Sequence, residues 1–292
     1  MGMRGLGQIK ELADIAEPTI GVITNVGTSH IELLGSQEAI AQAKGELIQA
    51  IKADGTAILN GDDNFVKAMD SLTAGKTIYY GIHQPATVQG VQLKYRKDGI
   101  GFTCRCFDEV FPVTVPMIGE HNVYDALAAI TVGRVLGVPS AKIAKGIAAF
   151  AGTPMRQEIV SFPDFVILND AYNANPASMA ESIRALGQLE GKRKIAMLGD
   201  MLELGGYTKE SHREIGRLLA EEGYSAVFTF GEAAKYIAKA AKEAGVPIVK
   251  PCTSHIEMAN EYLEMAAKGD VILVKGSRGL RMERVVQELK ER

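Results

Sequence analysis

The second half of the chain alternates short apolar runs with amphipathic stretches of helical period, and this alternation constrains the fold more than any other feature. Strands that alternate with helices of about 10–15 residues form βαβ units, whose parallel sheet is covered by helices on both faces. We therefore predict an open, doubly wound α/β domain with a mostly parallel sheet. The predicted strands span residues 165–169, 194–198, 226–230, 247–250 and 271–275, and the predicted helices span 178–189, 209–222, 232–244, 255–267 and 281–291.

The first half of the chain has a mixed pattern, with several short β-like runs at 77–115 that indicate an antiparallel patch. Gly152-Thr153-Pro154 separates the two halves, and glycine and proline commonly end regular elements. We predict a domain boundary there, with one domain at 1–152 and another at 153–292. The other elements expected in the first half are strands at 19–25 and 56–60 and helices at 37–51, 122–136 and 140–149.

Composition and charge exclude several classes of protein. Lysine and arginine number 32 against 35 aspartates and glutamates, a net charge of −3, and no basic run is available for nucleic acid. No stretch reaches the roughly 18 uncharged apolar residues of a membrane helix, since Arg134 interrupts the longest candidate. The N-terminus has no apolar secretory core, and the odd count of three cysteines is typical of reduced thiols. We expect a cytoplasmic protein with no nucleic-acid partner and no membrane insertion.

Three polar segments stand where an α/β protein binds its ligands. Residues 170–179 (DAYNANPASM) and 198–212 (LGDMLELGGYTKESH) begin where predicted strands end, and loops at the carboxyl ends of parallel strands are the usual ligand sites. Residues 119–129 (GEHNVYDALAA) begin a helix, whose first backbone N–H groups favour a phosphate or another polar ligand. The alternatives are an Asx-rich turn with a helix cap for the first segment and a plain helix cap for the third.

Two single residues are further candidates, and one apparent motif is rejected. His30 follows the first predicted strand in GTSH, and Lys44 lies in a predicted helix in AKGE. A structural histidine and a solvated lysine are the alternatives. The segment AGKT at 74–77 ends like the phosphate loop G-x-x-x-x-G-K-[ST], but Asp70 occupies the first glycine position and a strand follows in place of a helix.

Taken together and in this order, these segments resemble the Mur ligase family. DAYNANPASM and GDMLELG are typical of the member that adds the terminal dipeptide to a cell-wall precursor. Two departures are Asp125, where relatives usually have a second asparagine, and Thr28-Ser29, which precedes the histidine. The residues that carry the resemblance are VITNVGTSH (22–30), AKGE (43–46), LNGDD (59–63), GEHNVYDALAA (119–129), PMR (154–156), DAYNANPASM (170–179), LGDMLELG (198–205) and KGSR (275–278).

The resemblance implies a place within a longer architecture. Family enzymes have an N-terminal domain for a UDP sugar and a central ATPase domain whose phosphate loop precedes the point where this sequence begins. On this interpretation residues 1–152 are the latter part of the central ATP-binding domain, and residues 153–292 are the C-terminal domain. We expect the 292-residue chain alone not to catalyse ligation, because no segment replaces the phosphate-loop donors.

The resemblance also implies a reaction and its residues. ATP phosphorylates a carboxylate of UDP-N-acetylmuramoyl-tripeptide, and the amine of D-Ala-D-Ala then replaces the phosphate, with Mg2+ bridging the nucleotide phosphates. His30 resembles a magnesium ligand, and Lys44 resembles a lysine that is carbamylated beside the metal in several relatives, so both are candidate catalytic residues. The implied ATP-binding residues are Asn122, Arg156, Asp170, Tyr172 and Asn173, and the implied substrate-binding residues are Asn175, Lys275, Ser277 and Arg278.

Two other functions remain open at this point. A folate polyglutamate synthase of the same superfamily would share His30 and Lys44 but would not be expected to carry YNANP and ELG. A non-catalytic fragment or degenerate copy would keep the fold and bind a nucleotide or a partner without turnover, and the missing phosphate loop fits this alternative.

Overall fold

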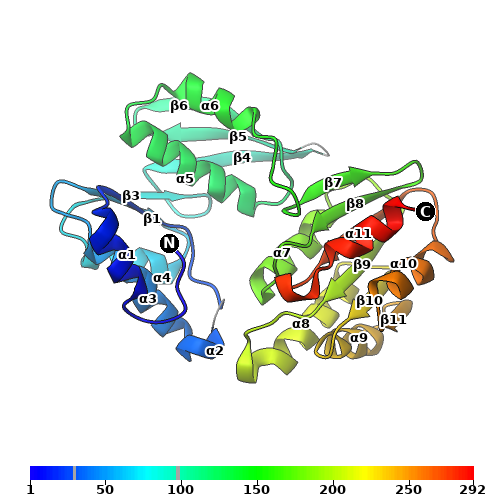
Figure 1. The fold of residues 1–292 in the computed structure, drawn as a ribbon. Helices are drawn as coiled ribbons and strands as arrows, with labels where there is room; N and C mark the ends of the chain where they lie inside the picture. The colour runs from blue at the N-terminus through cyan, green and yellow to red at the C-terminus, as the bar shows by residue number, and fades with distance from the viewer. Residues whose placement is uncertain (29–30, 97–98) are drawn as a thin grey trace. The chain divides into compact units, whose positions relative to one another are not determined.

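The computed structural model describes residues 1–28, 31–96 and 99–292. The chain divides into two compact units, Met1–Ala151 and Gly152–Arg292. Each unit is built on one six-stranded sheet with helices, and the predicted α/β fold class is confirmed (Figure 1). None of the helices in the described part of the chain has the length and apolar character that a membrane crossing requires.

The sheet of the first unit combines parallel and antiparallel pairing. Its strands, in the spatial order of the sheet, are β1 (Ile20–Ile23), β2 (Thr56–Asn60), β3 (Lys76–Gly81), β4 (Val88–Arg96), β5 (Gly99–Cys106) and β6 (Glu109–Val115). β1 to β3 and the start of β4 pair in parallel, whereas β4, β5 and β6 pair antiparallel. The predicted antiparallel patch at 77–115 therefore begins later than expected, at β4, because β3 is hydrogen-bonded in parallel to both of its neighbours.

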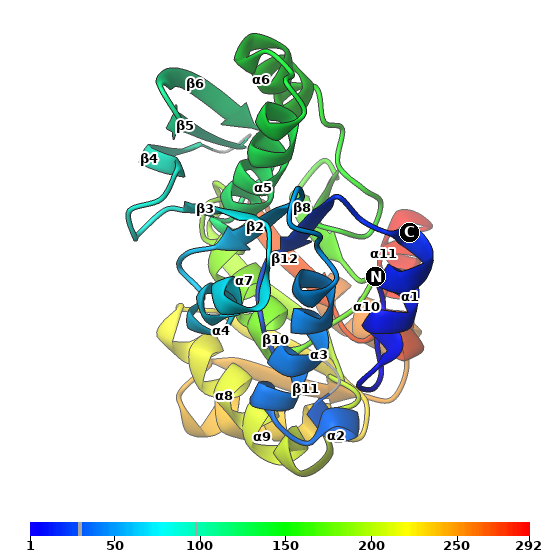
Figure 2. The ribbon, with the colours of Figure 1, turned by 90° about the vertical axis from the view of Figure 1, so that its left-hand side faces the viewer.

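Two groups of helices cover this sheet. The helices are α1 (Gln8–Ala16), α2 (Ile31–Leu34), α3 (Gln37–Gln49), α4 (Asn64–Ala68), the 3-10 helix η1 (Met69–Leu72), α5 (His121–Val135) and α6 (Ser140–Ala148). Figure 2 shows α5 and α6 together on one side of the antiparallel strands, where Leu127 and Ile130 of α5 pack with Ile100 and Phe102 of β5. α1 packs on α3, and Glu46 accepts hydrogen bonds from the N–H groups of Gly7 and Lys10 at its start, 2.6 and 3.0 Å away.

The sheet of the second unit is doubly wound. Its strands, in the spatial order of the sheet, are β11 (Ile248–Cys252), β10 (Ala226–Phe230), β9 (Arg193–Gly199), β12 (Asp270–Lys275), β8 (Phe165–Asp170) and β7 (Glu158–Ser161). All neighbours are parallel except β7, which is antiparallel to β8. The five predicted strands are present, and β7 is an edge strand that the sequence did not predict because four residues show too little periodicity.

Helices cover both faces of this second sheet. They are α7 (Pro176–Leu186), η2 (Gly205–Tyr207), α8 (Thr208–Glu221), α9 (Ala234–Glu243), α10 (His255–Leu263), η3 (Arg278–Leu280) and α11 (Glu283–Lys290). α7, α8 and α9 pack side by side on one face, and α10 and α11 pack together on the other.

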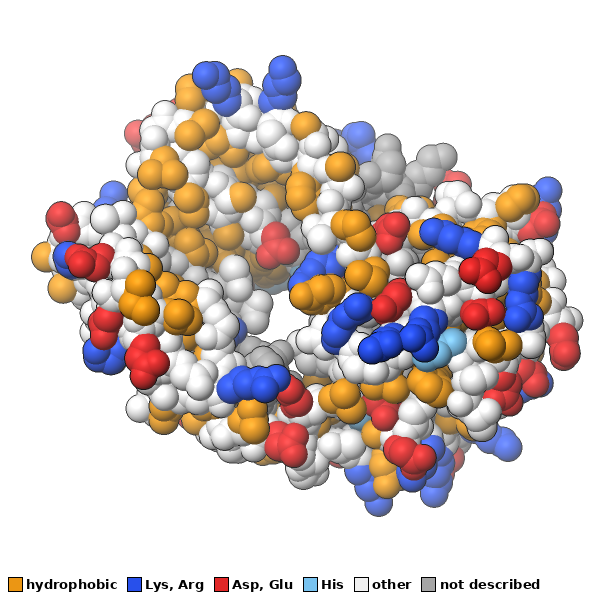
Figure 3. All heavy atoms as spheres, in the orientation of Figure 1, with side chains coloured by type: hydrophobic (Ala, Val, Ile, Leu, Met, Phe, Trp, Pro, Cys, Tyr) orange, Lys and Arg blue, Asp and Glu red, His pale blue; other side chains and the backbone are white. Residues whose placement is uncertain are grey.

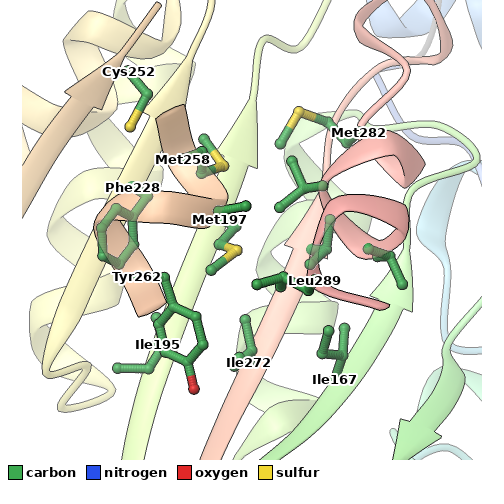
Figure 4. Packing of buried hydrophobic residues seen from close by; sticks show 14 of the residues in the cluster. Ile167, Ile195, Met197, Phe228, Cys252, Met258, Tyr262, Ile272, Met282 and Leu289 are labelled. Carbon is green, nitrogen blue, oxygen red and sulfur yellow. The ribbon is translucent and has the colours of Figure 1, made fainter. Parts of the chain in front are cut away.

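The core beneath α10 and α11 fixes the central strands. Figure 4 shows Met197, Phe228 and Ile272 of the strands packed with Tyr262 of α10 and Leu289 of α11. The rings of Phe228 and Tyr262 meet edge to face, with centroids 6.4 Å apart. Burying a large apolar side chain contributes about 1.5–3 kcal/mol. This packing therefore holds β8, β9 and β12 in a firm register, and the loops after these strands start from fixed points.

Candidate functional site

The carboxyl ends of β8 and β12 bring two charged residues together. Asp170 is the last residue of β8 and Lys275 is the last residue of β12, and they are partners in the parallel register. Lys275 Nζ lies 2.5 Å from Asp170 Oδ2, and the two side chains are 3% and 13% exposed. Sheet register thus joins two residues 105 positions apart in the sequence.

Each member of this pair makes further bonds within the unit. Asp170 accepts from Ser182 Oγ at 2.6 Å and from the N–H of Gln157 at 3.2 Å. Lys275 Nζ also donates to the carbonyl of Asn173, 3.1 Å away. Burial lowers the pKa of Lys275, and the Asp170 carboxylate opposes that shift. The charged atoms of both residues are thus bonded to other groups of the unit.

Arg156 and Tyr172 form an exposed stack beside this pair. The Arg156 guanidinium carbon lies 4.0 Å from the centroid of the Tyr172 ring, and the Tyr172 side chain is 42% exposed. Met155 and Gln157, on either side of Arg156, have left-handed φ values of 59° and 53°, a conformation that L residues rarely adopt. Tyr172 N–H donates to the carbonyl of Met155 at 3.1 Å. A strained segment is therefore held against the loop after β8, with both side chains open to a ligand.

The other predicted residues of this unit lie on the same loops. Asn175 caps α7 by accepting from the N–H of Ser178 at 2.9 Å, as the helix-cap alternative expects. Ser277 Oγ donates to the carbonyl of Ala174 at 3.1 Å, and Arg278 pairs with Glu283 at 2.9 Å. Figure 3 shows Lys and Arg side chains gathered over the region of η3 and the start of α11. The structure therefore brings together all the candidates predicted in the second unit.

The loop after β9 is held from within. Asp200 Oδ1 accepts from the N–H of Ala234 at 2.6 Å, and Gly231 packs so closely that a Cβ there would lie 2.3 Å from that oxygen. His212 is fully buried, and its Nε2 accepts from the N–H of Met201 at 3.0 Å. Its Nδ1 lies 2.6 Å from the carbonyl of Thr208, so a neutral ring protonated on Nδ1 satisfies both contacts. Burial lowers the pKa of His212.

In the first unit, Lys44 reaches the loop after β1. Its Nζ donates to the carbonyl of Asn25 at 2.6 Å. Burial lowers the pKa of Lys44, and the nearby Asp63 carboxylate opposes this. Asp63 itself accepts from the N–H of Val26 at 2.8 Å. A half-buried amine with a lowered pKa is unlike the solvated helix lysine that was the alternative. His30, the other candidate on this loop, lies outside the described residues.

The start of α5 holds the last predicted residue. Asn122 is buried, and its Nδ2 donates to the carbonyl of Ile118 at 2.6 Å. Tyr124 Oη donates to Asp62 at 2.9 Å, and Asp62 also accepts from three backbone N–H groups after β3. Despite its burial, the pKa of the Asp62 carboxyl is lowered because these bonds favour its charged form. Asp62 thus ties β2, β3 and α5 together.

Several residues of these sites were not predicted. Ser182 and the Gln157 N–H reach Asp170 through tertiary packing, and no local spacing marks them. Tyr80 of β3 is fully buried, and its hydroxyl has no hydrogen-bond partner within the described residues. Burial raises the pKa of Tyr80, and the carboxylates of Asp125 and Asp63 raise it further. A tyrosine in an apolar strand gives no sequence signal of such surroundings.

The fold and these sites define an α/β protein with polar loops at the carboxyl ends of its parallel strands. Two family models match the chain: "Mur ligase middle domain" over residues 1–133 and "Mur ligase, glutamate ligase domain" over residues 155–278. The chain belongs to the Mur ligase family.

Individual relatives agree with this assignment. The chain is 38% identical over its entire length to a UDP-N-acetylmuramoyl-tripeptide–D-alanyl-D-alanine ligase of Bacillus subtilis, of which it covers 63%. The same-named ligase of Synechocystis is 34% identical over 99% of the chain and 62% of that protein.

Solved structures of similar proteins extend the comparison. MurF of Acinetobacter baumannii has a TM-score of 0.90 at 28% identity, over 100% of this chain and 64% of that one. MurF of Thermotoga maritima in complex with ADP has a TM-score of 0.87 at 27% identity, over 98% of this chain and 65% of that one. The chain thus spans about two thirds of the length of these relatives.

Proposed function

We propose that the protein with this chain is an ATP-dependent ligase that joins D-Ala-D-Ala to UDP-N-acetylmuramoyl-tripeptide in peptidoglycan precursor synthesis in the cytoplasm. The observation that carries the proposal is the 38% identity to the Bacillus subtilis ligase over the whole chain. Residues 1–152 would be the latter part of a central ATP-binding domain, and residues 153–292 the C-terminal domain.

The proposed reaction has two displacement steps. A carboxylate oxygen of the tripeptide attacks the γ-phosphorus of ATP, which forms an acyl phosphate and releases ADP. The amine of D-Ala-D-Ala then attacks the acyl carbon, the amide bond forms, and phosphate leaves with the amine proton passing to a base or solvent. Such reactions depend mainly on positioning and on neutralising charge. The exposed Arg156 guanidinium suits the second task, and the Tyr172 ring fixes its direction.

Mg2+ belongs to the proposal only as an ion that the nucleotide brings. Across residues 1–28, 31–96 and 99–292, no three His, Cys, Asp or Glu side chains form a metal-binding group. Mg2+ in nucleotide sites is commonly held by one or two carboxylates together with phosphates and water. We assign no step to the ion.

The ligase proposal is tested by phosphate release with ATP, Mg2+ and both peptide substrates. The chain is assayed alone and as a fusion with the part of the Bacillus subtilis relative that it does not match. We expect no detectable turnover from the chain alone and turnover from the fusion that requires D-Ala-D-Ala. A folded fusion that binds ADP without turnover would instead favour the non-catalytic module, and turnover by the chain alone would contradict the expected need for a phosphate loop.

We propose that Lys44 is carbamylated, because its lowered pKa leaves more neutral amine to attack CO2, which forms the carbamate and releases a proton. The measurement is the 13C spectrum of the chain in 13C-bicarbonate with Mg2+. We expect a carbamate resonance that Lys44→Ala removes. Lys52→Ala is the matched control, because Lys52 is an exposed lysine paired with Glu17 and its pKa is raised. A spectrum that Lys44→Ala leaves unchanged would contradict the proposal, since a resonance from the Met1 α-amine is present in both chains.

A further inference from the structure

The amine of Lys275 is enclosed by protein groups. It pairs with Asp170 at 2.5 Å and donates to the carbonyl of Asn173 at 3.1 Å, and only 3% of the side chain is exposed. Two of its three N–H donors are used within the unit, and its burial leaves little of the amine accessible to a ligand. The sequence resemblance places Lys275 among the substrate-binding residues, but this geometry indicates a different task.

The pair bonds to the two segments that carry the exposed stack. Lys275 binds the Asn173 carbonyl, next to Tyr172 in the loop after β8. Asp170 accepts from the N–H of Gln157, next to Arg156 in the strained segment. One ion pair therefore anchors the backbone beside both exposed side chains.

Stability alone does not account for such a pair. Well-packed apolar residues of similar volume often stabilise a protein as well as a buried ion pair does, because the pair must first lose its water. A third charge adds to this cost, since the Arg156 guanidinium also lowers the pKa of Lys275. What apolar residues cannot supply is directed hydrogen bonds to the two loops.

We propose that Lys275 and Asp170 are positioning residues, whose buried pair sets the places of Tyr172 and Arg156 so that these two exposed side chains can contact the nucleotide. The contact with the nucleotide rests on the function proposed above. The positioning of the two loops does not, and it can be measured separately.

The same strand offers a matched control. Asp270 at the start of β12 pairs with Arg193 of β9, with Arg193 Nη2 2.7 Å from Asp270 Oδ2, and its side chain is fully buried. Its other bonds come from Tyr262 Oη and the N–H of Ala267, neither of which lies near the loop after β8 in the chain. Arg193→Met therefore leaves a buried carboxylate without its cation, as Lys275→Met does, but it does not change the Arg156–Tyr172 stack.

The experiment uses a single fluorophore to measure how accessible the loop after β8 is to a quencher in solution. The sequence contains no tryptophan, so Tyr172→Trp places one indole in the loop. Acrylamide quenching of this indole is compared in the Tyr172→Trp background with Lys275→Met or Arg193→Met added. ADP affinity is measured by calorimetry in chains that keep Tyr172, and the melting temperature is measured for every variant.

We expect Lys275→Met to increase quenching and to weaken ADP binding roughly threefold to thirtyfold, the range for residues that act through others. Arg193→Met should lower the melting temperature comparably and leave quenching and ADP affinity unchanged. If the two variants give the same quenching, the pair has only a structural role and the proposal is overturned.

Two further variants cover the case in which Lys275→Met does not fold. Lys275→Arg keeps the charge but changes the donor geometry, and Asp170→Asn/Lys275→Met removes both charges. The double variant should return to the melting temperature of the parent. Its quenching should stay above that of the parent and its ADP affinity below, because the bond to the Asn173 carbonyl is still absent. If the quenching of the double variant falls to that of the parent, the positioning role is overturned. If the parent chain binds no ADP, affinity is measured in the fusion with the unmatched part of the Bacillus subtilis relative. A folded fusion that binds no ADP would count against the nucleotide function, while quenching would still decide the positioning role.

Discussion

The two ends of β12 carry the same chemistry for different purposes. Asp270 begins the strand and pairs with Arg193 of β9, and Lys275 ends it and pairs with Asp170 of β8. The ion-pair distances are 2.7 and 2.5 Å, and every residue of the strand is buried. Burial and charge pairing therefore do not tell the two ends apart.

The two pairs differ in the further groups to which they are hydrogen-bonded. Asp270 also binds the hydroxyl of Tyr262, a residue of α10 that is itself packed in the core. Lys275 binds the carbonyl of Asn173, in a loop with exposed side chains. In an open parallel sheet, ligand loops follow the carboxyl ends of the strands. On the proposal above, the pair at the carboxyl end positions a ligand loop, whereas the pair at the amino end holds the core.

The largest effect should come from breaking the pair at the amino end. Arg193→Met leaves the fully buried Asp270 carboxylate without its cation, and we expect a loss of about 3–5 kcal/mol in the free energy of unfolding. Urea denaturation gives the value. Arg184→Met, which breaks an exposed pair with Glu181, is the control and should cost no more than about 0.5 kcal/mol. Equal losses in the two variants would mean that burial does not set the cost.

The two edges of the sheet should also contribute to the free energy of unfolding over different ranges of pH. Burial raises the pKa of Asp270, but its bonds to Arg193, Ala267 N–H and Tyr262 outweigh this and hold the pKa below its usual value. Its stabilisation is therefore complete above the unfolded pKa of about 3.9 and is lost as pH falls below that value. At the carboxyl edge of the sheet, burial lowers the pKa of His212 of α8, which bonds the loop after β9. His212 therefore stabilises the fold above its unfolded pKa of about 6.5 and loses this effect as pH falls.

We therefore predict that the free energy of unfolding falls as the pH is lowered from about 7.5 to about 5, and that His212 causes this loss. Asp200 and the Thr208 carbonyl partly oppose the shift, since both favour the charged ring. The measurement is urea denaturation at several pH values. His212→Gln can still accept from the N–H of Met201 but does not titrate, so its stability should be nearly flat over this range. A parent-like slope in His212→Gln would place the titration elsewhere.

The sequence predicted the fold where structure follows from local periodicity, and missed what depends on register. The pattern located the five parallel strands of the second unit and placed Asp170 and Lys275 at strand ends, so it brought them to one edge. It could not show that they pair with each other, because that depends on β12 lying next to β8. The same reason hides Arg193 and Asp270, which are 77 positions apart. The edge strand β7 is too short to reveal itself.

The roles given to single residues show the same limit. A motif resemblance carries residue types and order, so it groups Asn175, Tyr172 and Lys275 as ligand-binding residues, Tyr172 for ATP and the other two for substrate. The structure separates a helix cap, an exposed ring and an enclosed amine within that group. Only packing distinguishes side chains that face a ligand from those that hold the loops.

The smallest effect should come from the exposed stack itself. Tyr172→Leu removes the ring beneath the Arg156 guanidinium, a contact with a centroid distance of 4.0 Å. Exposed cation–π contacts are worth about 0.5–1 kcal/mol. We therefore expect the free energy of unfolding to fall by no more than about 1 kcal/mol, because the ring is 42% exposed. We expect ADP affinity to fall about two- to fivefold, because the Arg156 guanidinium loses the ring that fixes its direction. Tyr172→Phe keeps the ring and should bind ADP like the parent, and calorimetry compares all three chains.

A loss well above tenfold in Tyr172→Leu would match the 1–3 kcal/mol of base stacking and would mean that the ring touches the nucleobase directly. A loss of about 3 kcal/mol or more in the free energy of unfolding would instead place Tyr172 with Arg193 and Asp270, among the residues that hold the fold.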